Sequence, residues 1–212
     1  MYICVKLSNI KMKSIALDPG NYSGTYKLVG EEISFDFINT ISWPGTEREH
    51  DWLDVPGNFI LWATAAGIIS KSKAKLLSRI SGVKLTKEME YVQSIRYELS
   101  KILTPLAFDK KPPEGAIADL NILIHQIVQQ RSIDLKTQKW VWNDFLSLRE
   151  VLAPIIWNAG HVITEIDHAR IKHCPSCNWI FYDNTKNKSR RWCDMKDCGS
   201  RDKSLRYYHS QK

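Results

Sequence analysis

Four cysteines near the end of the chain limit what this sequence can fold into more than any other feature. Cys174 and Cys177 are spaced C-x2-C, Cys193 and Cys198 are spaced C-x4-C, and fifteen residues separate the two pairs. Two close pairs of soft ligands at such a separation are typical of a structural zinc site, because a tight turn can bring each pair onto one side of a tetrahedral ion. The spacing therefore predicts a zinc site.

Two other interpretations of the cysteines remain open. A redox C-x-x-C pair needs βαβ surroundings, whereas helical patterns dominate upstream. Disulfides need an oxidising compartment, and the first residues show no uninterrupted apolar segment and no clear cleavage site for secretion. We expect a cytoplasmic protein with one structural zinc ion held by the four thiolates of Cys174, Cys177, Cys193 and Cys198. Since four thiolates complete the coordination shell, no position is left for a catalytic water.

Positive charge is concentrated in the same segment. The chain of 212 residues carries a formal net charge of +7, and residues 171–212 hold 10 Lys and Arg against 4 Asp and Glu. A localised positive patch raises the local concentration of polyanions, of which phosphate backbones are the commonest. The alternative is a solvated basic tail that aids solubility.

The segment between and after the cysteine pairs predicts a small zinc finger. Residues 178–184 are rich in aromatic and β-branched residues and predict a strand, and 190–193 predict a returning strand of the same hairpin. Helix-forming residues follow Cys198, so we expect a treble-clef-like finger. Trp179, Phe181 and Trp192 fit its small core better than a base-stacking surface. The candidate nucleic-acid contacts are Lys186, Lys188, Arg190 and Arg191 on the hairpin and Arg201, Lys203 and Arg206 on the helix.

The rest of the chain predicts a mainly α fold with small β elements. We expect an N-terminal extension over residues 1–25, a mostly helical domain over 26–170 with strands in 26–43, and the finger over 171–212. Helical periodicity covers about 55–67, 71–81, 86–104, 114–131 and 145–165, with a hairpin in 132–144. Asp54 can cap the first of these helices and Gly67 can end it. Residues 165–174 are expected to lead into the finger as a continuous helix.

Enzymatic activity is not expected from this sequence. It has no Gly-rich phosphate loop, no nucleophile elbow and no H-E-x-x-H motif. Asp36, Asn39 and Thr40 lie together and form a candidate small-molecule effector site. The longest apolar stretch, near residues 59–69, is far shorter than the roughly 20 residues that a membrane span needs, so no membrane association is expected.

The finger resembles the CGNR zinc finger family, whose pattern is C-x2-C-x-W/L-F-x-D, a basic turn, R-R-W-C and then C-G-N-R. Ser200 departs from this pattern where the family has Asn, and it keeps a small polar side chain able to cap a helix. Upstream, Phe37, Asn39 and Thr40 resemble the F-x-N-T signature of the ABATE-type domain that accompanies this finger. The matching finger positions are Cys174, Cys177, Trp179, Phe181, Asp183, Arg190, Arg191, Trp192, Cys193, Cys198, Gly199 and Arg201.

The resemblance implies a bacterial transcription regulator that binds DNA through the finger, with a stress role in some members. The N-terminal domain would then sense a signal or form a homodimer, because a single finger is a small DNA-binding module. The alternative is a zinc-stabilised protein–protein or RNA-binding module without sequence-specific DNA binding, since closed Cys4 fingers also serve as rigid scaffolds.

Overall fold

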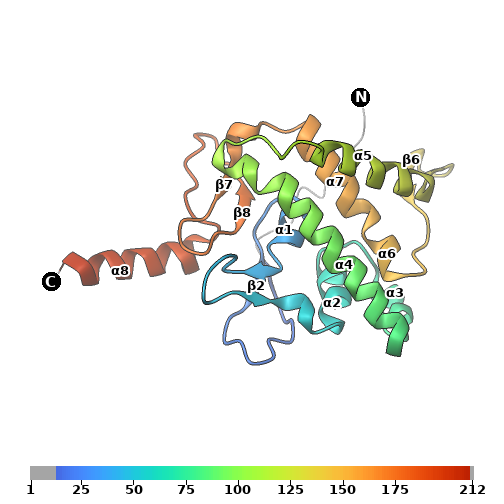
Figure 1. Cartoon of the computed structure of the whole chain (residues 1–212), viewed down its shortest axis with the longest axis horizontal. Coiled ribbons are helices and arrows are strands. Elements are labelled where there is room, and N and C mark those ends of the chain that lie inside the picture. Colours follow the sequence, from blue (N-terminus) through green and yellow to red (C-terminus); the bar gives the residue numbers. More distant parts are fainter. Residues whose placement is uncertain (1–12, 211–212) are drawn as a thin grey trace.

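The protein is described here from a computed structural model of residues 13–210 (Figure 1). Residues 1–12 of the expected N-terminal extension and residues 211–212 lie outside the described part. We call residues 13–170 the body and residues 171–210 the finger. About half of the described chain is helical and the strands form small pairs, which confirms the predicted fold class.

The body contains most of the helices. Their order along the chain, with the short strands between them, is β1 Lys13–Ile15, β2 Tyr26–Leu28, α1 Ile33–Ile38, β3 Ile41–Ser42, β4 His50–Asp51, a 3-10 turn Trp52–Asp54, α2 Gly57–Ala65, α3 Lys71–Leu77, α4 Gly82–Leu103, a 3-10 turn Pro105–Phe108, α5 Ala116–Ile127, a 3-10 turn Val128–Gln130, β5 Arg131–Asp134, β6 Lys139–Trp142, α6 Leu148–Val151, α7 Ala153–Thr164 and a 3-10 turn His168–Arg170.

Helix α1 occupies the centre of the body. All six of its residues are buried, and it packs against α4 and α7 (Figure 1). The long helix α4 turns its predicted apolar stripe inward, with Val92, Ile95 and Leu99 buried. The other predicted helices are also found, within a few residues of their expected ends.

The prediction of strands throughout residues 26–43 was wrong at α1. Its sequence, ISFDFI, alternates as a half-buried strand would, but the segment is buried on every side, so alternation does not distinguish strand from helix. A helix of six residues leaves most of its backbone groups without a partner inside the helix, and other groups supply partners here: the Ser34 N–H donates to Asn158 Oδ1 at 2.9 Å, and the Tyr26 hydroxyl donates to the Asp36 carbonyl at 2.5 Å. Gly30 makes the turn into this helix possible, since a Cβ there would lie 2.8 Å from the Phe35 Cβ.

Asp54 does not cap α2, contrary to the prediction. The carboxylate that caps this region is Asp51, which accepts from the Leu53 N–H at 2.7 Å at the start of the 3-10 turn before α2. Gly67 follows the end of α2 with a φ of +77°, in agreement with its expected role as a helix terminator.

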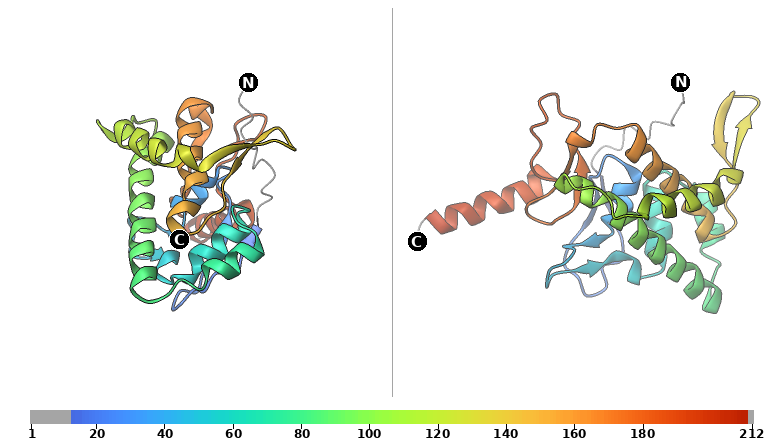
Figure 2. Two further views of the ribbon diagram at one scale, coloured as in Figure 1. Left: turned by 90° about the vertical axis from the view of Figure 1, so that its right-hand side faces the viewer. Right: turned by 45° about the horizontal axis from the view of Figure 1, so that its top comes forward.

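Strand β1 pairs antiparallel with β2, so the expected boundary at residue 25 falls inside a hairpin. We therefore count residues 13–25 with the body. The hairpin expected in 132–144 is confirmed as β5–β6, which projects from the body (Figure 2). Among residues 13–210, no helix is long and apolar enough to cross a membrane.

The finger consists of β7 Ile171–His173, β8 Ile180–Tyr182, a π-helical turn Met195–Gly199 and α8 Ser200–Ser210. The strand in 178–184 is confirmed, but its partner is β7, ahead of the first cysteine, and residues 190–193 form no strand. The helical lead-in was also wrong, since α7 ends at Thr164 and β7 begins at Ile171. Helix α8 extends away from the body (Figure 1).

Candidate metal centre and basic surface

The four predicted cysteines form one cluster. All four are buried, and their sulfur atoms lie within 4.8 Å of one another. The Cys177 and Cys193 sulfurs are 3.5 Å apart and those of Cys193 and Cys198 are 3.6 Å apart. A disulfide would require about 2.0 Å, whereas zinc–sulfur bonds of about 2.3 Å in a tetrahedron place the sulfurs about 3.8 Å apart. The cluster fits one structural zinc ion.

The first cysteine pair lies in the turn that joins β7 to β8. The Cys174 N–H donates to the Trp179 carbonyl at 2.8 Å, and the Asn178 N–H donates to the Cys174 carbonyl at 2.9 Å. Asn178 adopts a φ of 62°, which asparagine tolerates better than most residues. These bonds fold the chain back within five residues and direct the sulfurs of Cys174 and Cys177 to the same side.

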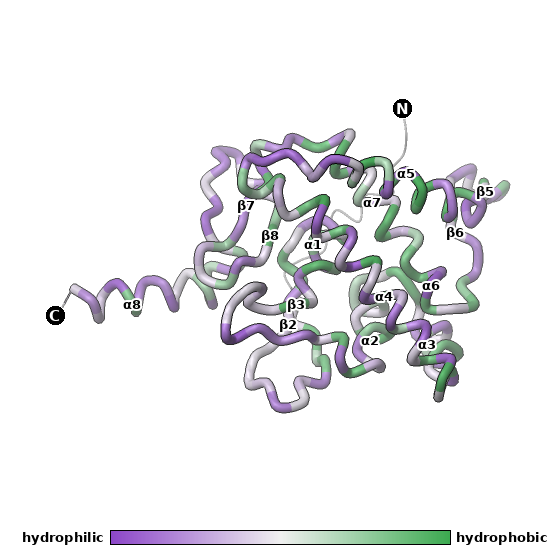
Figure 3. Tube along the Cα trace, in the orientation of Figure 1, coloured by the Kyte–Doolittle hydropathy of each residue, from purple (hydrophilic) through white to green (hydrophobic). Residues whose placement is uncertain are grey.

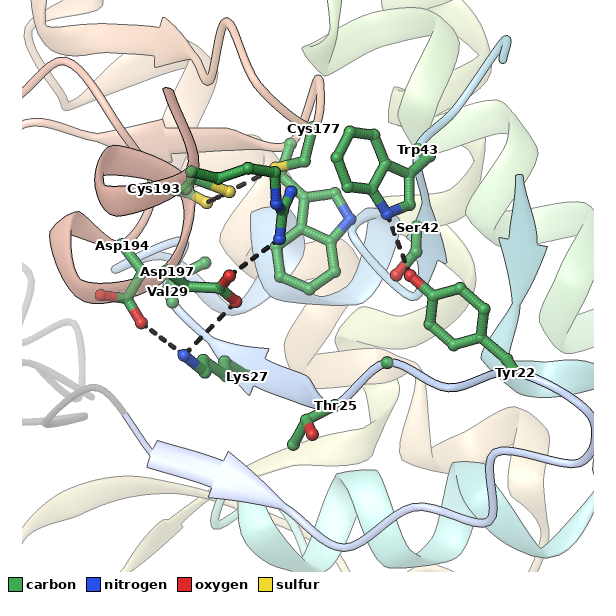
Figure 4. A pocket seen from close by; sticks show the side chains of 14 residues that line it. Tyr22, Thr25, Lys27, Val29, Ser42, Trp43, Cys177, Cys193, Asp194 and Asp197 are labelled. Atoms are coloured by element: carbon green, nitrogen blue, oxygen red, sulfur yellow. Dashed lines mark hydrogen bonds and ion pairs between the residues drawn. The ribbon is translucent and has the colours of Figure 1, made fainter. Parts of the chain in front are cut away.

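The second pair is held by the turn before α8. Asp194 caps that turn by accepting from the Lys196 N–H at 2.8 Å, and its carbonyl accepts from the Gly199 N–H at 3.0 Å. On the body side, the Lys27 ammonium reaches the Asp194 carboxylate at 2.6 Å and that of Asp197 at 3.5 Å (Figure 4). The metal centre is therefore supported by a side chain of the β1–β2 hairpin.

The finger packs directly on the body. Asn39 makes two hydrogen bonds with the backbone of Ile180, donating to its carbonyl at 2.9 Å and accepting from its N–H at 3.0 Å. The Trp179 indole donates to the Ile41 carbonyl at 2.8 Å. Trp179 and Phe181 are buried, in agreement with the prediction that they are core residues, but the core they join includes the body.

Arg190 uses every donor of its guanidinium within the protein and joins the finger to the body through two of them, at Val29 and Glu31. An arginine side chain has five N–H donors, and here they reach five acceptors: the carbonyls of Val29, Tyr182, Trp192 and Cys193 at 2.6–3.3 Å and the Glu31 carboxylate at 3.2 Å. The guanidinium also lies over the Phe181 ring. No donor remains for a phosphate, so we remove Arg190 from the candidate nucleic-acid surface.

Asp183 organises the basic loop that follows β8. Burial alone would raise the pKa of this carboxyl, but hydrogen bonds from Lys172, Thr185 and the Arg190 N–H lower it to about 2. Asp183 is therefore a charged structural group near neutral pH. It fixes both ends of the loop from Asn184 to Ser189.

Asp36, Asn39 and Thr40 do not form the expected effector site. All three are buried, and each is bound to the protein itself. Asp36 Oδ1 accepts from the N–H groups of Val29 and Gly30 at 2.8 Å. Thr40 Oγ1 accepts from Arg96 at 2.8 Å, and Arg96 also binds Asp51. These residues connect α1, α4 and the finger, and they leave no surface for a ligand.

Asp36 makes the stability of the protein depend on pH. Burial raises the pKa of its carboxyl from 3.8 to about 7, against the two backbone hydrogen bonds that lower it. Between pH 3.8 and about 7 the Asp36 carboxyl keeps its proton in the folded protein but releases it in the unfolded chain. The free energy of unfolding therefore falls as pH rises through this range. The full effect is about 4 kcal/mol.

We predict that Asp36→Asn removes this dependence, because the amide oxygen can still accept from Val29 and Gly30. Between pH 5 and pH 7 the wild type should lose about 2 kcal/mol of unfolding free energy relative to the variant. Urea unfolding of both proteins at several pH values measures their unfolding free energies. The difference between the two curves isolates Asp36, because all other titrating groups are common to both proteins. Parallel curves for the two proteins would contradict this assignment.

The other predicted basic residues divide into two groups. Lys188 pairs with Asp167 at 2.8 Å, Arg201 with Asp197 at 2.8 Å and Arg206 with Asp202 at 2.9 Å. Three exposed residues, by contrast, have no carboxylate within salt-bridge distance in the part of the chain that the structure describes; they are Lys186, Arg191 and Lys203. Lys196, which the sequence analysis missed, is exposed beside Cys198 and belongs with this second group.

Comparison with protein families agrees with this architecture. The model of the CGNR zinc finger matches residues 170–211. The model of the ABATE family, described as "Putative stress-induced transcription regulator", matches residues 31–166, which is more than half of the chain. The chain belongs to the ABATE family. No curated protein matches it.

As an ABATE-family protein with a CGNR zinc finger, the chain has the domain composition that its sequence motifs predicted. The two family descriptions are those of a transcription regulator and a zinc finger, and neither is that of an enzyme. Membership also explains why Arg190 and Arg191 resembled the family's R-R-W-C motif equally, although only Arg191 is exposed. No sequence signal marks this difference, because the two arginines are adjacent and chemically identical and the contacts of Arg190 come from Val29 and Glu31.

Proposed function

We propose that this protein is a DNA-binding transcription regulator of the bacterial cytoplasm that contacts duplex DNA through the finger. The observation that carries the proposal is a group of four exposed cations, around α8 and the loop before it, that pair with no carboxylate of residues 13–210: Lys186, Arg191, Lys196 and Lys203. Unpaired surface cations can replace the counterions of a phosphate backbone without first breaking an internal ion pair.

The shape of α8 supports this proposal. None of its residues is buried, and it extends from the finger as a mostly hydrophilic helix (Figures 1 and 3). The major groove of B-DNA is wide enough to admit an α-helix. The zinc ion would hold the base of this helix, while the Asn184–Ser189 loop lies ahead of it along the chain. We also propose that the body senses a stress signal or forms a homodimer, since one finger of this size gives limited specificity.

A second candidate function is protein binding through the same helix. Leu205, Tyr207 and Tyr208 of α8 are large apolar or aromatic residues that are 53%, 69% and 57% exposed. Exposed aromatic residues are enriched at protein interfaces. RNA binding by the basic loop is the other form of this alternative.

We predict that Arg191→Ala/Lys203→Ala weakens binding to duplex DNA and lowers the slope of log affinity against log salt by about 2, one for each lost phosphate contact. Lys136→Ala/Lys139→Ala is the matched control, because both lysines lie on the β5–β6 hairpin, far from α8 (Figure 1). Fluorescence anisotropy with labelled duplex at several salt concentrations measures both variants.

Equal slopes for the two double variants would overturn the DNA-binding proposal. Tighter binding to single-stranded RNA than to duplex DNA, with the same loss in Arg191→Ala/Lys203→Ala, would favour the RNA alternative. Binding of a protein partner that is lost in Leu205→Ala/Tyr208→Ala, without any duplex binding, would favour the protein-binding alternative.

A further inference from the structure

Two arginines from different parts of the molecule lie on the ring of Trp43. The guanidinium carbon of Arg201, in the first turn of α8, is 4.8 Å from the ring centroid. That of Arg48, in the body loop between β3 and β4, is 5.4 Å from the same centroid. The two guanidinium groups are therefore at most about 10 Å apart, close enough to contact one phosphate or two adjacent phosphates of a DNA strand.

The backbone at Trp43 is held in an unfavourable conformation. Its φ is 56°, which is rare for a bulky residue, and it precedes Pro44, which normally favours an extended conformation. Such strain persists only where the surroundings fix it, and it is concentrated at functional sites.

Contacts on both sides of the loop hold this conformation. The Trp43 indole donates to the Tyr22 hydroxyl at 2.9 Å (Figure 4), and the Trp43 carbonyl accepts from the Thr46 hydroxyl at 2.8 Å. Asn178, between the first cysteine pair and β8, donates to the Pro44 carbonyl at 3.3 Å. The loop is thus attached to the finger itself, and it keeps Trp43 beside the first turn of α8.

The charges around Arg48 leave it free to bind an anion. Arg48 is exposed, and no carboxylate of residues 13–210 lies within salt-bridge distance of it. The carboxylate of the neighbouring Glu49 does not pair with Arg48; it accepts a hydrogen bond from the Gly45 N–H at 2.7 Å. Arg201 is already paired with the Asp197 carboxylate through Nη2 at 2.8 Å, so a phosphate would share this guanidinium with Asp197 and bind the unpaired Arg48 as its second partner. The planar guanidinium is suited to phosphate because it donates two parallel hydrogen bonds.

We propose that Arg48 and Arg201 on Trp43 form a phosphate-binding site for the DNA backbone, to which the body contributes as well as the finger. This inference rests on the proposed function and extends it, because the DNA surface then crosses from α8 to the β3–β4 loop. It also means that the finger alone binds DNA with fewer contacts than the whole chain.

The experiment compares duplex DNA binding by full-length, zinc-loaded wild type and three variants. Arg48→Ala should weaken binding about fivefold and reduce the log–log salt slope by about 1. Arg48→Lys keeps the positive charge and should restore the slope but only part of the affinity. Arg79→Ala is the matched control, since Arg79 is exposed at the end of α3, far from α8 (Figure 1), and it should behave as wild type.

The results separate this inference from the proposed function. If Arg48→Ala has the slope of Arg79→Ala while Arg191→Ala/Lys203→Ala loses about 2, the finger binds DNA without the body and this inference is wrong. If wild type shows no salt-dependent duplex binding, both proposals fail. Zinc content and the thermal midpoint are measured for each of the three variants. Both should equal those of wild type, because the side chains of Arg48 and Arg79 are exposed.

Discussion

Cys193→Ser is expected to abolish stoichiometric zinc binding and to unfold the finger. Structural zinc sites contribute about 10–16 kcal/mol of apparent binding free energy in isolated zinc-finger peptides, and that energy is folding energy. Cys193 lies centrally in the cluster, with its sulfur 3.5 Å and 3.6 Å from two other ligands. A serine hydroxyl is a much poorer zinc ligand than a thiolate, so the cluster should not hold the ion.

The loss should extend beyond the finger. Trp179 and Phe181 are buried together with residues of the body, and Asn39 of the body binds the backbone of β8. When the finger unfolds, the body residues that pack against Trp179 and Phe181 become exposed to solvent. We therefore expect the thermal midpoint of the whole protein to fall, with no separate body transition at the wild-type temperature.

Metal analysis and calorimetry of purified protein test this prediction. Ser189→Ala is the control, because Ser189 is exposed and its hydrogen bond to Thr185 uses the backbone N–H, which the substitution keeps. Chelation of zinc from the wild type should reproduce the behaviour of Cys193→Ser. One zinc per chain in Cys193→Ser, with an unchanged midpoint, would show that the other three cysteines suffice.

The metal centre could be predicted from the sequence because its determinants are local. Two cysteine pairs at fixed spacing specify a metal site without knowledge of the rest of the fold. The long helix α4 was predictable for a similar reason, since its apolar stripe repeats over many turns. In both cases the signal lies within one short segment.

The parts that escaped prediction depend on distant residues. Whether ISFDFI forms a helix or a strand is decided by the elements packed around it, among them α4, α7 and β8. The partner of β8 is β7, although residues 190–193 had a comparable strand pattern, because the Asn184–Ser189 loop is held by Asp183 and Arg190 is drawn toward the body. The role of Arg190 depends on Val29 and Glu31, about 160 residues away in the chain. No local pattern contains such information.

The Val29–Gly30 turn is one of the points at which body and finger meet. On one side, both N–H groups of the turn donate to the buried Asp36 carboxylate. On the other side, the Val29 carbonyl accepts from Arg190 at 2.8 Å and the Gly30 carbonyl accepts from the Tyr182 N–H at 2.9 Å. A change in the position of this turn would therefore change the position of the finger.

Arg190 and Arg191 provide a direct test of this arrangement, because two adjacent arginines should have opposite effects. Arg190→Ala leaves the Glu31 carboxylate and the Val29 and Cys193 carbonyls without their donor in a largely buried site. We expect it to lower the free energy of unfolding by about 3 kcal/mol. Arg191 is exposed over the Trp192 ring, so Arg191→Ala should change stability by less than about 0.5 kcal/mol while it weakens DNA binding.

Urea unfolding of zinc-loaded protein measures both variants, with Arg190→Lys as a third. Lysine keeps the charge near Glu31 but has three donors on one nitrogen, so it cannot span five acceptors and should recover only part of the loss. If Arg190→Ala and Arg191→Ala have the same unfolding free energy, Arg190 does not fix the finger to the body. If they differ as expected, the first arginine of the R-R-W-C motif acts in folding, and any weakening of DNA binding in Arg190→Ala follows from a displaced finger and not from a lost phosphate contact.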